Sequence, residues 1–357
     1  MRLRLLALVA LPWFVFAAAP QNTVTDVVTA VFTALSAHWD DAKLAKALHK
    51  LRLVEHLDQH VMEELESRFP GPKTSEELLR LHDESEGLKE PTDLPNFPSP
   101  LAPDYAEKRR VLLEAGKNAL SYASTMPDFI CTETVRRYES WVGRPVWDLK
   151  DSLVIKVSYF DKVEDYKLAT VNGHATKLSY ENLRGAVTEG EFASMLVNIF
   201  EPSAKTEFWW DHWTTLRQRV THVFRFQIKQ QNSHYRMDFG MEGLTHQTAV
   251  AGQHGFLYVD RDSSRIVRVI ADADSLPPDF PVTSSSTVLD YDFVDISGTR
   301  FLLPLHADAR MGTIQLKTRN VMDFSAYRKF AGESTITFEA APEDKAPEKD
   351  KPPPVKK

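Results

Sequence analysis

The sequence predicts an α+β protein: a small N-terminal helical bundle, then a large, curved, mainly antiparallel β-sheet of half-barrel shape with a packed helix. Apolar residues recur at helical spacing as far as Leu81 and at a spacing near two from Phe129 onward. The later segments follow one another without regular alternation of strands and helices, which favours antiparallel pairing. About eight to twelve strands are expected, and a twisted sheet of that size curls.

Composition places the chain among ordinary globular proteins. It has 357 residues, of which 43% are hydrophobic and 26% charged, and that length suffices for two domains with separate cores. The net charge of −7, with no basic stripe, argues against binding to nucleic acid. Cys131 is the single cysteine, so no internal disulfide can form, and we expect a buried structural thiol.

Residues 1–19 have the pattern of a signal peptide. Arg2 and Arg4 precede twelve apolar residues from Leu5 to Phe16, and Ala17–Ala19 supplies small residues for cleavage. That apolar run is too short for a stable membrane span, which takes about twenty residues, and no later segment is apolar enough. We therefore predict an exported protein, periplasmic or secreted, with no membrane span after removal of the signal. An uncleaved N-terminal anchor is the alternative.

Residues 20–90 are predicted to form a helical domain. Three apolar stripes at helical spacing support it: Val24, Val27, Val28, Val31 and Leu35; Leu44, Ala47, Leu48 and Leu51; and Val54, Leu57, Val61 and Leu65. Asp40 and Asp41 are candidate caps for the second helix. The third helix is expected to end at the segment 70–72, and Thr74 begins a capping box for a fourth.

A stiff, extended linker is predicted over residues 91–104, which contain five prolines. Asp104 is a candidate cap for a further helix, and with that helix begins the second predicted domain, residues 105–340. Residues 341–357 consist mainly of Pro, Lys, Glu and Asp, and such a composition predicts a disordered tail.

The second domain is predicted to be mainly a sheet, because segments rich in β-branched and aromatic residues follow one another. They cover residues 129–140, 152–160, 164–171, 174–180, 205–213, 218–228 and 234–240, four or more strands within 255–311, and finally 313–324 and 333–340. Asn172 and Gly173 predict a tight hairpin turn, because a type I′ turn needs two residues with positive φ. One helix, Glu189–Phe200, is predicted to interrupt the strands and to pack on the sheet.

Two clusters of polar residues are candidate metal sites. His56, His60 and Glu63 have the spacing of one helix face, but on a helical wheel that face lies opposite the apolar stripe and is expected to be solvated. The second cluster lies in a predicted hairpin loop: Asp260, Asp262, Ser263 and Ser264. That loop lacks the glycine and the glutamate of a calcium-binding EF-hand, which favours a plain turn. The sequence therefore predicts neither a metal ion nor a cofactor.

Aromatic residues of the sheet are the candidate ligand-binding residues. In an extended strand Trp209 and Trp213 point one way and Trp210 the other, so that one face presents aromatic surface to a sugar or lipid. The alternative is that these rings fill the core of the sheet, as such clusters commonly do. A half-barrel would turn a second apolar set inward: Phe224, Phe226, Ile228, Leu289, Tyr291 and Phe293.

Catalytic motifs are not recognised in this chain. It has no Gly-x-Ser-x-Gly, no Ser-x-x-Lys with its companion motifs and no glycine-rich phosphate loop. Nothing in the sequence demands an enzyme, and no catalytic residue is predicted.

Several segments resemble an uncharacterised family of exported bacterial proteins, among them ALSYASTMPDFICTETVRRYES, TEGEFASMLVNIFEPSAKTEFWW and GFLYVDRDSSRIVRVIADADSLPPDFPV. The sheet alone, through RIVRV, DY and LLP, is loosely similar to half-barrel carriers that bind lipids or lipoprotein acyl chains in the bacterial envelope. In those carriers a bent antiparallel sheet wraps the apolar ligand, and helices close the mouth. The resemblance implies a concave apolar site without catalytic residues, although the N-terminal helical domain is a departure from it.

Three functions remain open at this point. The first is a non-catalytic envelope protein that binds a hydrophobic or lipid-like molecule in the concave sheet. The second is a structural component that docks on another envelope protein through the helical domain. The third, placed below both, is a hydrolase of unknown class.

Overall fold

The computed structural model describes residues 21–68, 71–93, 97, 100–142, 147–179, 194–239 and 247–330. Within these residues the fold class is the predicted one, with six α-helices and an open, curved antiparallel sheet of eleven strands. The predicted signal peptide (1–19), the last predicted strand (333–340) and the predicted tail (341–357) lie outside the described residues.

Four helices form an N-terminal unit, here called the helical module: α1 (Val24–Ser36), α2 (Asp41–Leu48), α3 (Gln59–Glu66) and α4 (Pro72–Ser85). Apolar residues at helical spacing give each helix a buried stripe. The stripes meet in a core separate from that of the sheet, and its members include Val24, Val31, Leu44, Leu48, Leu57, Leu65 and Leu78. Thr23 caps α1, and Asp40 caps α2 as predicted.

The third helix starts later than predicted. α3 begins at Gln59 rather than near Val54, because Asp58 caps it by accepting a hydrogen bond from the Val61 amide. Leu57 lies just before this cap and is fully buried. Leu57 is therefore apolar because it is buried in the core, although its spacing from Val61 is also that of a helix.

The predicted capping box at Thr74 is wrong. α4 already begins at Pro72, after Gly71 with a φ of 98°. The carboxylate of Asp41, at the start of α2, accepts hydrogen bonds from the Lys73 and Thr74 amides at 3.0 and 2.8 Å. A neighbouring helix thus supplies the cap that the local sequence was expected to provide.

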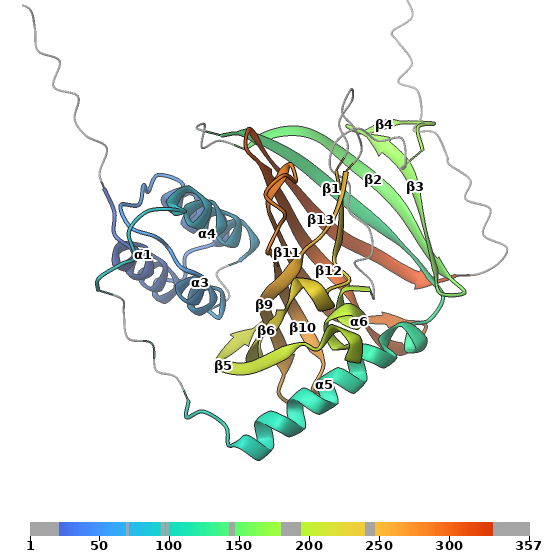
Figure 1. Ribbon diagram of the computed structural model, residues 1–357. Coiled ribbons are helices and arrows are strands. Elements are labelled where there is room, and N and C mark those ends of the chain that lie inside the picture. Colours follow the sequence, from blue (N-terminus) through green and yellow to red (C-terminus); the bar gives the residue numbers. More distant parts are fainter. Residues whose placement is uncertain are drawn as a thin grey trace, which may run out of the picture.

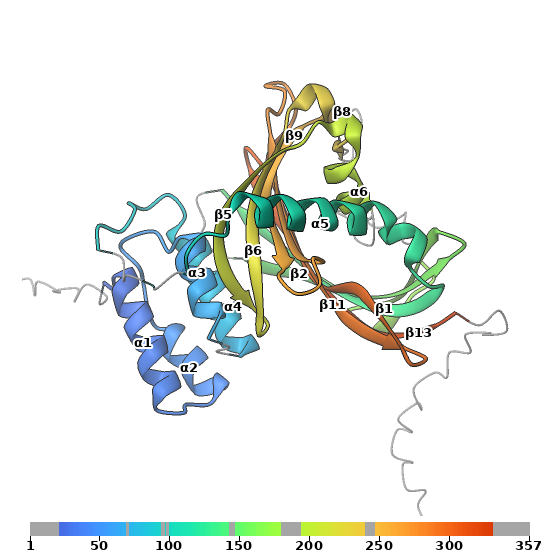
Figure 2. The same cartoon turned by 90° about the horizontal axis from the view of Figure 1, so that it is seen from below.

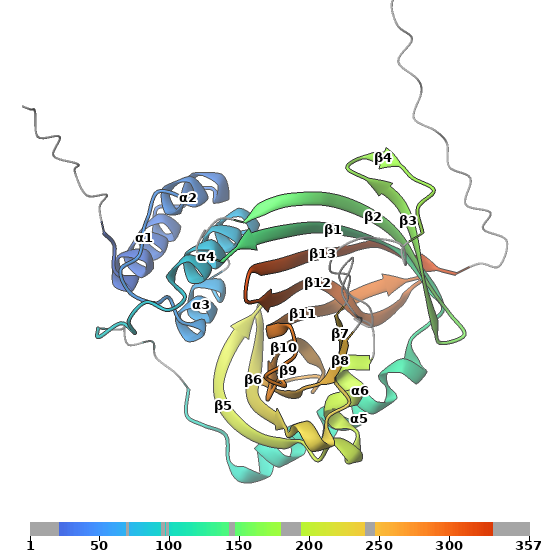
Figure 3. The same ribbon diagram turned by 45° about the horizontal axis from the view of Figure 1, so that its top comes forward.

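The main sheet contains β1 (Phe129–Trp141), β2 (Asp148–Phe160), β3 (Val163–Val171), β4 (His174–Ala175), β5 (Glu207–Leu216), β6 (Arg219–Ile228), β9 (Gly252–Asp260), β10 (Ile266–Asp274), β11 (Val282–Ile296), β12 (Thr299–Thr313) and β13 (Leu316–Lys329). Their order is β4-β3-β2-β1-β13-β12-β11-β10-β9-β6-β5. Figure 3 shows how this sheet curls from β2 round to β5. A second sheet consists of β7 (Arg236–Phe239) and β8 (Gln247–Val250).

Most strand predictions agree with the structure, and the exceptions lie at the edges. Asn172 and Gly173 adopt φ values of 51° and 78°, as the predicted hairpin turn requires. The following strand ends at Ala175, well short of the predicted 174–180. The strand predicted at 234–240 forms β7, outside the main sheet.

Helices cover both sides of the curved sheet. α5 (Tyr105–Thr125), capped by Asp104 as predicted, crosses the concave side together with α6 (Ser194–Phe200). The helical module lies against the opposite, convex side (Figures 1 and 2). Of the helix predicted at Glu189–Phe200, residues 189–193 lie outside the described residues and residues 194–200 form α6. The division into domains at 20–90 and 105–340 stays a prediction. Among the described residues, no helix combines the length and apolar character needed to cross a membrane.

Candidate ligand-binding site

The concave face is built from every second residue of the strands, since side chains alternate between the faces of a sheet. In β6 and β11 these residues are bulky and apolar, and each is at most 2% exposed: Phe224, Phe226, Ile228, Leu289 and Tyr291. They share one core with the α5 side chains of Val111, Ala115, Ala119 and Tyr122. The face is therefore apolar, as predicted, and α5 covers it.

The predicted inward residues pack against one another and against α5 rather than around a wide opening. Phe293 differs from the rest of its set because it is only half-buried, near the end of β11. The guanidinium carbons of Arg219 and Arg300 each lie 5.0 Å from the centre of its ring. The assignment of these aromatic residues to a ligand stays a prediction.

The tryptophans of β5 do not alternate as predicted. A bulge between Trp210 and His212 breaks the register with β6, so that Trp210 and Trp213 lie on the same, concave side with ring centres 6.0 Å apart. Trp209 points to the other face and is 46% exposed. The predicted pairing of Trp209 with Trp213 is therefore wrong, because the bulge adds one residue between them.

Helix α5 meets the concave face through small side chains as well as through the larger Val111 and Tyr122. Ala115 and Ala119 are buried there, and Gly116 lies so close to α6 that an added Cβ would be 3.0 Å from the Phe200 ring. Two larger apolar residues of the same helix, Leu113 and Leu120, are about half exposed on its outer side. The inward side of α5 thus combines small and large side chains, and part of its outer side is apolar.

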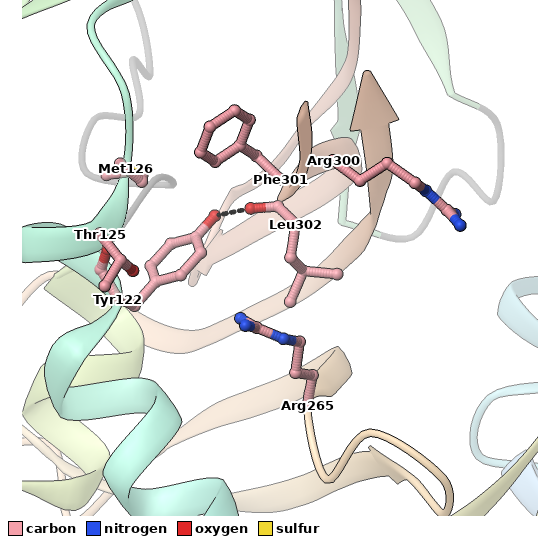
Figure 4. A pocket seen from close by; sticks show the side chains of 7 residues that line it. All are labelled: Tyr122, Thr125, Met126, Arg265, Arg300, Phe301 and Leu302. Atoms are coloured by element: carbon pink, nitrogen blue, oxygen red, sulfur yellow. Dashed lines mark hydrogen bonds between the residues drawn. The ribbon is translucent and has the colours of Figure 1, made fainter. Parts of the chain in front are cut away.

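Two hydrogen bonds tie α5 to the sheet. The Tyr122 hydroxyl donates to the Leu302 carbonyl at 2.7 Å, and Asn118 Nδ2 donates to the Ser264 carbonyl at 3.0 Å. Burial raises the pKa of Tyr122 far above its usual value, so the phenol remains a neutral donor. Beside this bond lies a cavity of about 170 Å³ (Figure 4), lined by Tyr122, Thr125, Met126, Arg265, Arg300, Phe301 and Leu302.

Two side chains beneath α5 have buried nitrogens without a hydrogen-bond partner among the described residues. They are His222, whose two ring nitrogens are both unbonded, and Trp210, whose Nε1 is unbonded. A carboxylate oxygen of Glu107 lies 3.8 Å from His222 Nε2, beyond hydrogen-bond distance. Burial, and then the charges of Arg110 and Arg261, lower the pKa of His222 to about 4. The imidazole is therefore neutral at pH 7.

The contact between the helical module and the convex face contains charged groups that the sequence did not reveal. Glu63 of α3 is 5% exposed; one carboxylate oxygen lies 2.7 Å from His212 Nε2, and the other accepts a hydrogen bond from Tyr258. The prediction that His56, His60 and Glu63 share a solvated helix face is therefore wrong. His56 precedes α3, and Glu63 faces the sheet. In the described part of the chain, no group of side chains gathers that would hold a metal ion.

Further ion pairs lie beside Glu63. Arg268 of β10 donates to Asp290 of β11 at 2.8 Å and to Glu66 of α3 at 2.9 Å. Burial would raise the pKa of Asp290, but the charges and hydrogen bonds of Arg268 and Arg217 outweigh it and hold that pKa well below its usual value. The carboxylate therefore stays charged at physiological pH.

The same arrangement recurs nearer β13. Asp308 of β12 accepts hydrogen bonds from Arg310 and Arg319, and Arg310 also donates to Asp83 of α4. Despite its burial, the two arginines lower the pKa of Asp308 to about 2. Alternating charged residues in the predicted strands were the available signal. Such alternation predicts that one face of the sheet is polar, but it does not predict whether water or another part of the protein covers that face.

Two other predictions are confirmed. Asp260 anchors the β9–β10 turn, because its carboxylate accepts bonds from the Asp262 and Ser263 amides and from the Ser263 hydroxyl. Cys131 is a buried free thiol, and burial raises its pKa to about 12. It is therefore a structural residue and not a nucleophile.

No protein-family model matches the chain, and no curated protein matches it in sequence. Among solved structures, a LolA superfamily protein from Nitrosomonas europaea is similar at 11% identity and a TM-score of 0.25, over 62% of this chain and 93% of that one. A DUF1329 family protein from Desulfovibrio piger is similar at 11% identity and a TM-score of 0.29, over 66% and 96%. A structure described as an outer membrane lipoprotein-sorting protein domain, from Vibrio parahaemolyticus, is similar at 10% identity and a TM-score of 0.28, over 63% and 94%. These likenesses concern the fold alone.

Proposed function

We propose that this protein is an exported, non-catalytic envelope protein that binds a hydrophobic or lipid-like ligand between its concave sheet and helix α5. The proposal includes the signal peptide at 1–19 and a periplasmic or secreted location. Its support is the apolar concave face, since small-molecule sites are mostly concave and apolar. The proposed contacts are the inward members of the predicted set: Trp210, Trp213, Phe224, Phe226, Tyr291 and Phe293.

The size of the cavity beside α5 constrains how such a ligand would enter. Its volume of about 170 Å³ is smaller than the roughly 300–1,000 Å³ of typical ligand pockets. A lipid-sized ligand therefore requires α5 to move away from the sheet. In that state the ligand would cover the aromatic residues that α5 now covers.

The state of α5 is the observation that carries the proposal. Its alanines bury few apolar groups, and each buried methylene contributes only about 0.8 kcal/mol. With α5 in place, His222 and Trp210 have no hydrogen-bond partner among the described residues, and each such group costs about 1–3 kcal/mol. Displacement of α5 by an amphiphile that offers a hydrogen-bond acceptor or donor would remove this cost. A cover that leaves polar groups unpaired suits a site that opens.

Mass spectrometry of organic extracts tests the proposal directly. Protein purified from its own host should retain an apolar molecule that is absent from an extract of a control protein purified in parallel. After delipidation, the protein should bind a fluorescent fatty-acid analogue saturably, and the extracted molecule should displace it. Absence of both a retained molecule and saturable binding of the analogue would refute the proposal.

A further inference from the structure

Three turns at one end of the sheet enclose a groove of about 460 Å³, which shares only Phe293 with the ligand contacts proposed above. The turns join β5 to β6, β9 to β10, and β11 to β12. The charged residues of the groove are Arg219, Asp260, Arg261, Asp262 and Arg300. Arg300 also lines the smaller cavity beside α5, together with Arg265. The two spaces therefore adjoin, and Figure 4 shows Arg265 and Arg300 among the residues that line the smaller cavity.

The two aspartates of the groove are largely engaged in the β9–β10 turn. One oxygen of Asp260 accepts three hydrogen bonds from the turn itself, and the other lies 3.7 Å from Arg219. Asp262 is exposed, with an oxygen 3.4 Å from Arg261 Nε. Neither aspartate forms a close bidentate pair with an arginine, which would occupy the N–H donors of that guanidinium group.

Arg300 and Arg265 have no carboxylate within 4.0 Å and no hydrogen-bond acceptor for their guanidinium groups anywhere in the described ranges. The Arg300 guanidinium lies over the Phe293 ring, as does that of Arg219. Phe293 thus holds two guanidinium groups at the groove by cation–π attraction. The N–H donors of Arg300 remain available to a ligand, whereas those of Arg219 lie 3.7 Å from carboxylate oxygens of Asp260 and Asp292.

The β5–β6 turn is held firmly in place beside the groove. Arg217 and Gln218 adopt φ values of 46° and 63°, which non-glycine residues rarely adopt. The Arg217 guanidinium donates to Asp290 and to the Tyr291 and Val267 carbonyls at 2.8 to 2.9 Å. These bonds fasten the turn across two neighbouring strands. The residue that follows, Arg219, is therefore positioned before any ligand binds.

We propose that this groove binds a phosphate group, which Arg300, Arg261 and Arg219 hold. Guanidinium groups present paired donors that match the oxygens of a phosphate, and several can share one phosphate. The phosphate belongs either to a small soluble molecule or to the head group of a phospholipid. In the second case the inference rests on the proposed function, because the acyl chains would enter the adjoining space beneath α5.

Calorimetric titration with four probes separates these sources. Glycerol 3-phosphate and dihexanoyl phosphatidate carry the phosphate; glycerol and dihexanoylglycerol are the matched probes without it. Both phosphates should bind, and Arg300→Gln should weaken them about tenfold or more, the loss expected for one charge-assisted hydrogen bond. Arg261→Gln should act in the same direction. The control is Arg68→Gln, which removes an arginine of the helical module that lies outside the groove and should change neither affinity.

The pattern of binding decides between the alternatives. If dihexanoyl phosphatidate binds much more tightly than glycerol 3-phosphate, the ligand is a lipid head group. If the two affinities are equal, the ligand is a small soluble phosphate. The phosphate site is overturned if neither phosphate binds saturably at millimolar concentration, or if Arg300→Gln and Arg68→Gln have equal effects. If dihexanoylglycerol still binds in that case, the proposed function stands and the phosphate site alone fails. If glycerol 3-phosphate binds while both lipids do not, the site stands and the proposed function fails.

Discussion

His212 of β5 and Glu63 of α3 lie 2.7 Å apart, from Nε2 to a carboxylate oxygen, across the contact between the sheet and the helical module. The other ring nitrogen of His212 lies 2.8 Å from Asp211. An imidazole with a carboxylate at each nitrogen is satisfied best when both nitrogens carry a proton. The same Glu63 carboxylate accepts a hydrogen bond from the Tyr258 hydroxyl. One buried acid therefore joins the module to two strands of the sheet.

Glu63→Gln should loosen this contact. The amide keeps the size of the side chain but removes the charge opposite His212, and loss of one partner from a buried pair costs about 3 kcal/mol. Equilibrium urea unfolding measures the loss. Glu64→Gln is the matched control, because it removes only the partially exposed partner of Arg68 and should cost about 0.5 kcal/mol or less. Equal losses for the two variants would contradict the role given to Glu63.

The stability that His212 contributes should depend on pH. Burial disfavours its charged form, but the hydrogen bonds and charges of Glu63 and Asp211 outweigh burial and raise its pKa above 6.5. A group whose pKa is higher in the folded state stabilises fully below its unfolded pKa, and loses this effect as the pH rises through the folded pKa. His212→Gln should therefore be much less stable than the wild type at acidic pH and differ less at alkaline pH. Urea unfolding of both proteins across that range measures the difference.

His222 should have the opposite effect. Burial first, and then the nearby Arg110 and Arg261, lower its pKa to about 4, although Glu107 also faces it at 3.8 Å. Between about pH 6.5 and pH 4 the unfolded chain binds a proton that the folded chain does not, so this residue costs stability as the pH falls. His222→Gln should remove that part of the acid sensitivity. A wild type and variant that lose stability in parallel on acidification would rule this out.

Tyr122→Phe should make α5 easier to displace. The variant removes the bond from the hydroxyl to the Leu302 carbonyl, worth about 1 kcal/mol, or roughly fivefold in an opening equilibrium. Stopped-flow mixing with the fluorescent fatty-acid analogue should show entry about fivefold faster. Tyr105→Phe is the control, since that side chain of the same helix is 79% exposed. An unchanged entry rate in Tyr122→Phe would count against α5 as the cover of the site.

Local patterns predicted the fold because they depend on residues close in sequence. Alternation along residues 152–160 and the turn at Asn172 and Gly173 require no knowledge of the partner strand, and both agree with the structure. The bulge between Trp210 and His212 arises only when β5 pairs with β6. No pattern within β5 reveals it. The orientation of Trp213 was therefore beyond prediction, although the presence of the strand was not.

The candidate site was predicted less completely for a related reason. A helical wheel identifies the face of α3 that lies opposite its apolar stripe, but not what covers that face. Glu63 is such a residue, and the sheet rather than water covers it. Likewise, the apolar residues of β6 and β11 predicted an apolar concave face. They did not indicate that Ala115 and Ala119 of α5 would occupy the space in front of it.

The pairing of β1 with β13 determines when the sheet can be completed. Thr134 lies opposite Asp323, so about 190 residues separate two strands that are hydrogen-bonded neighbours. Hairpins such as β2–β3 and β11–β12 close quickly, because their strands adjoin in sequence. The pairing of β1 with β13 can form only after β13, which lies late in the sequence, has been added. Until then two half-sheets expose unpaired edges, which favour association with other chains. A chain that stops before β13 should therefore aggregate, even though every hairpin before it can form.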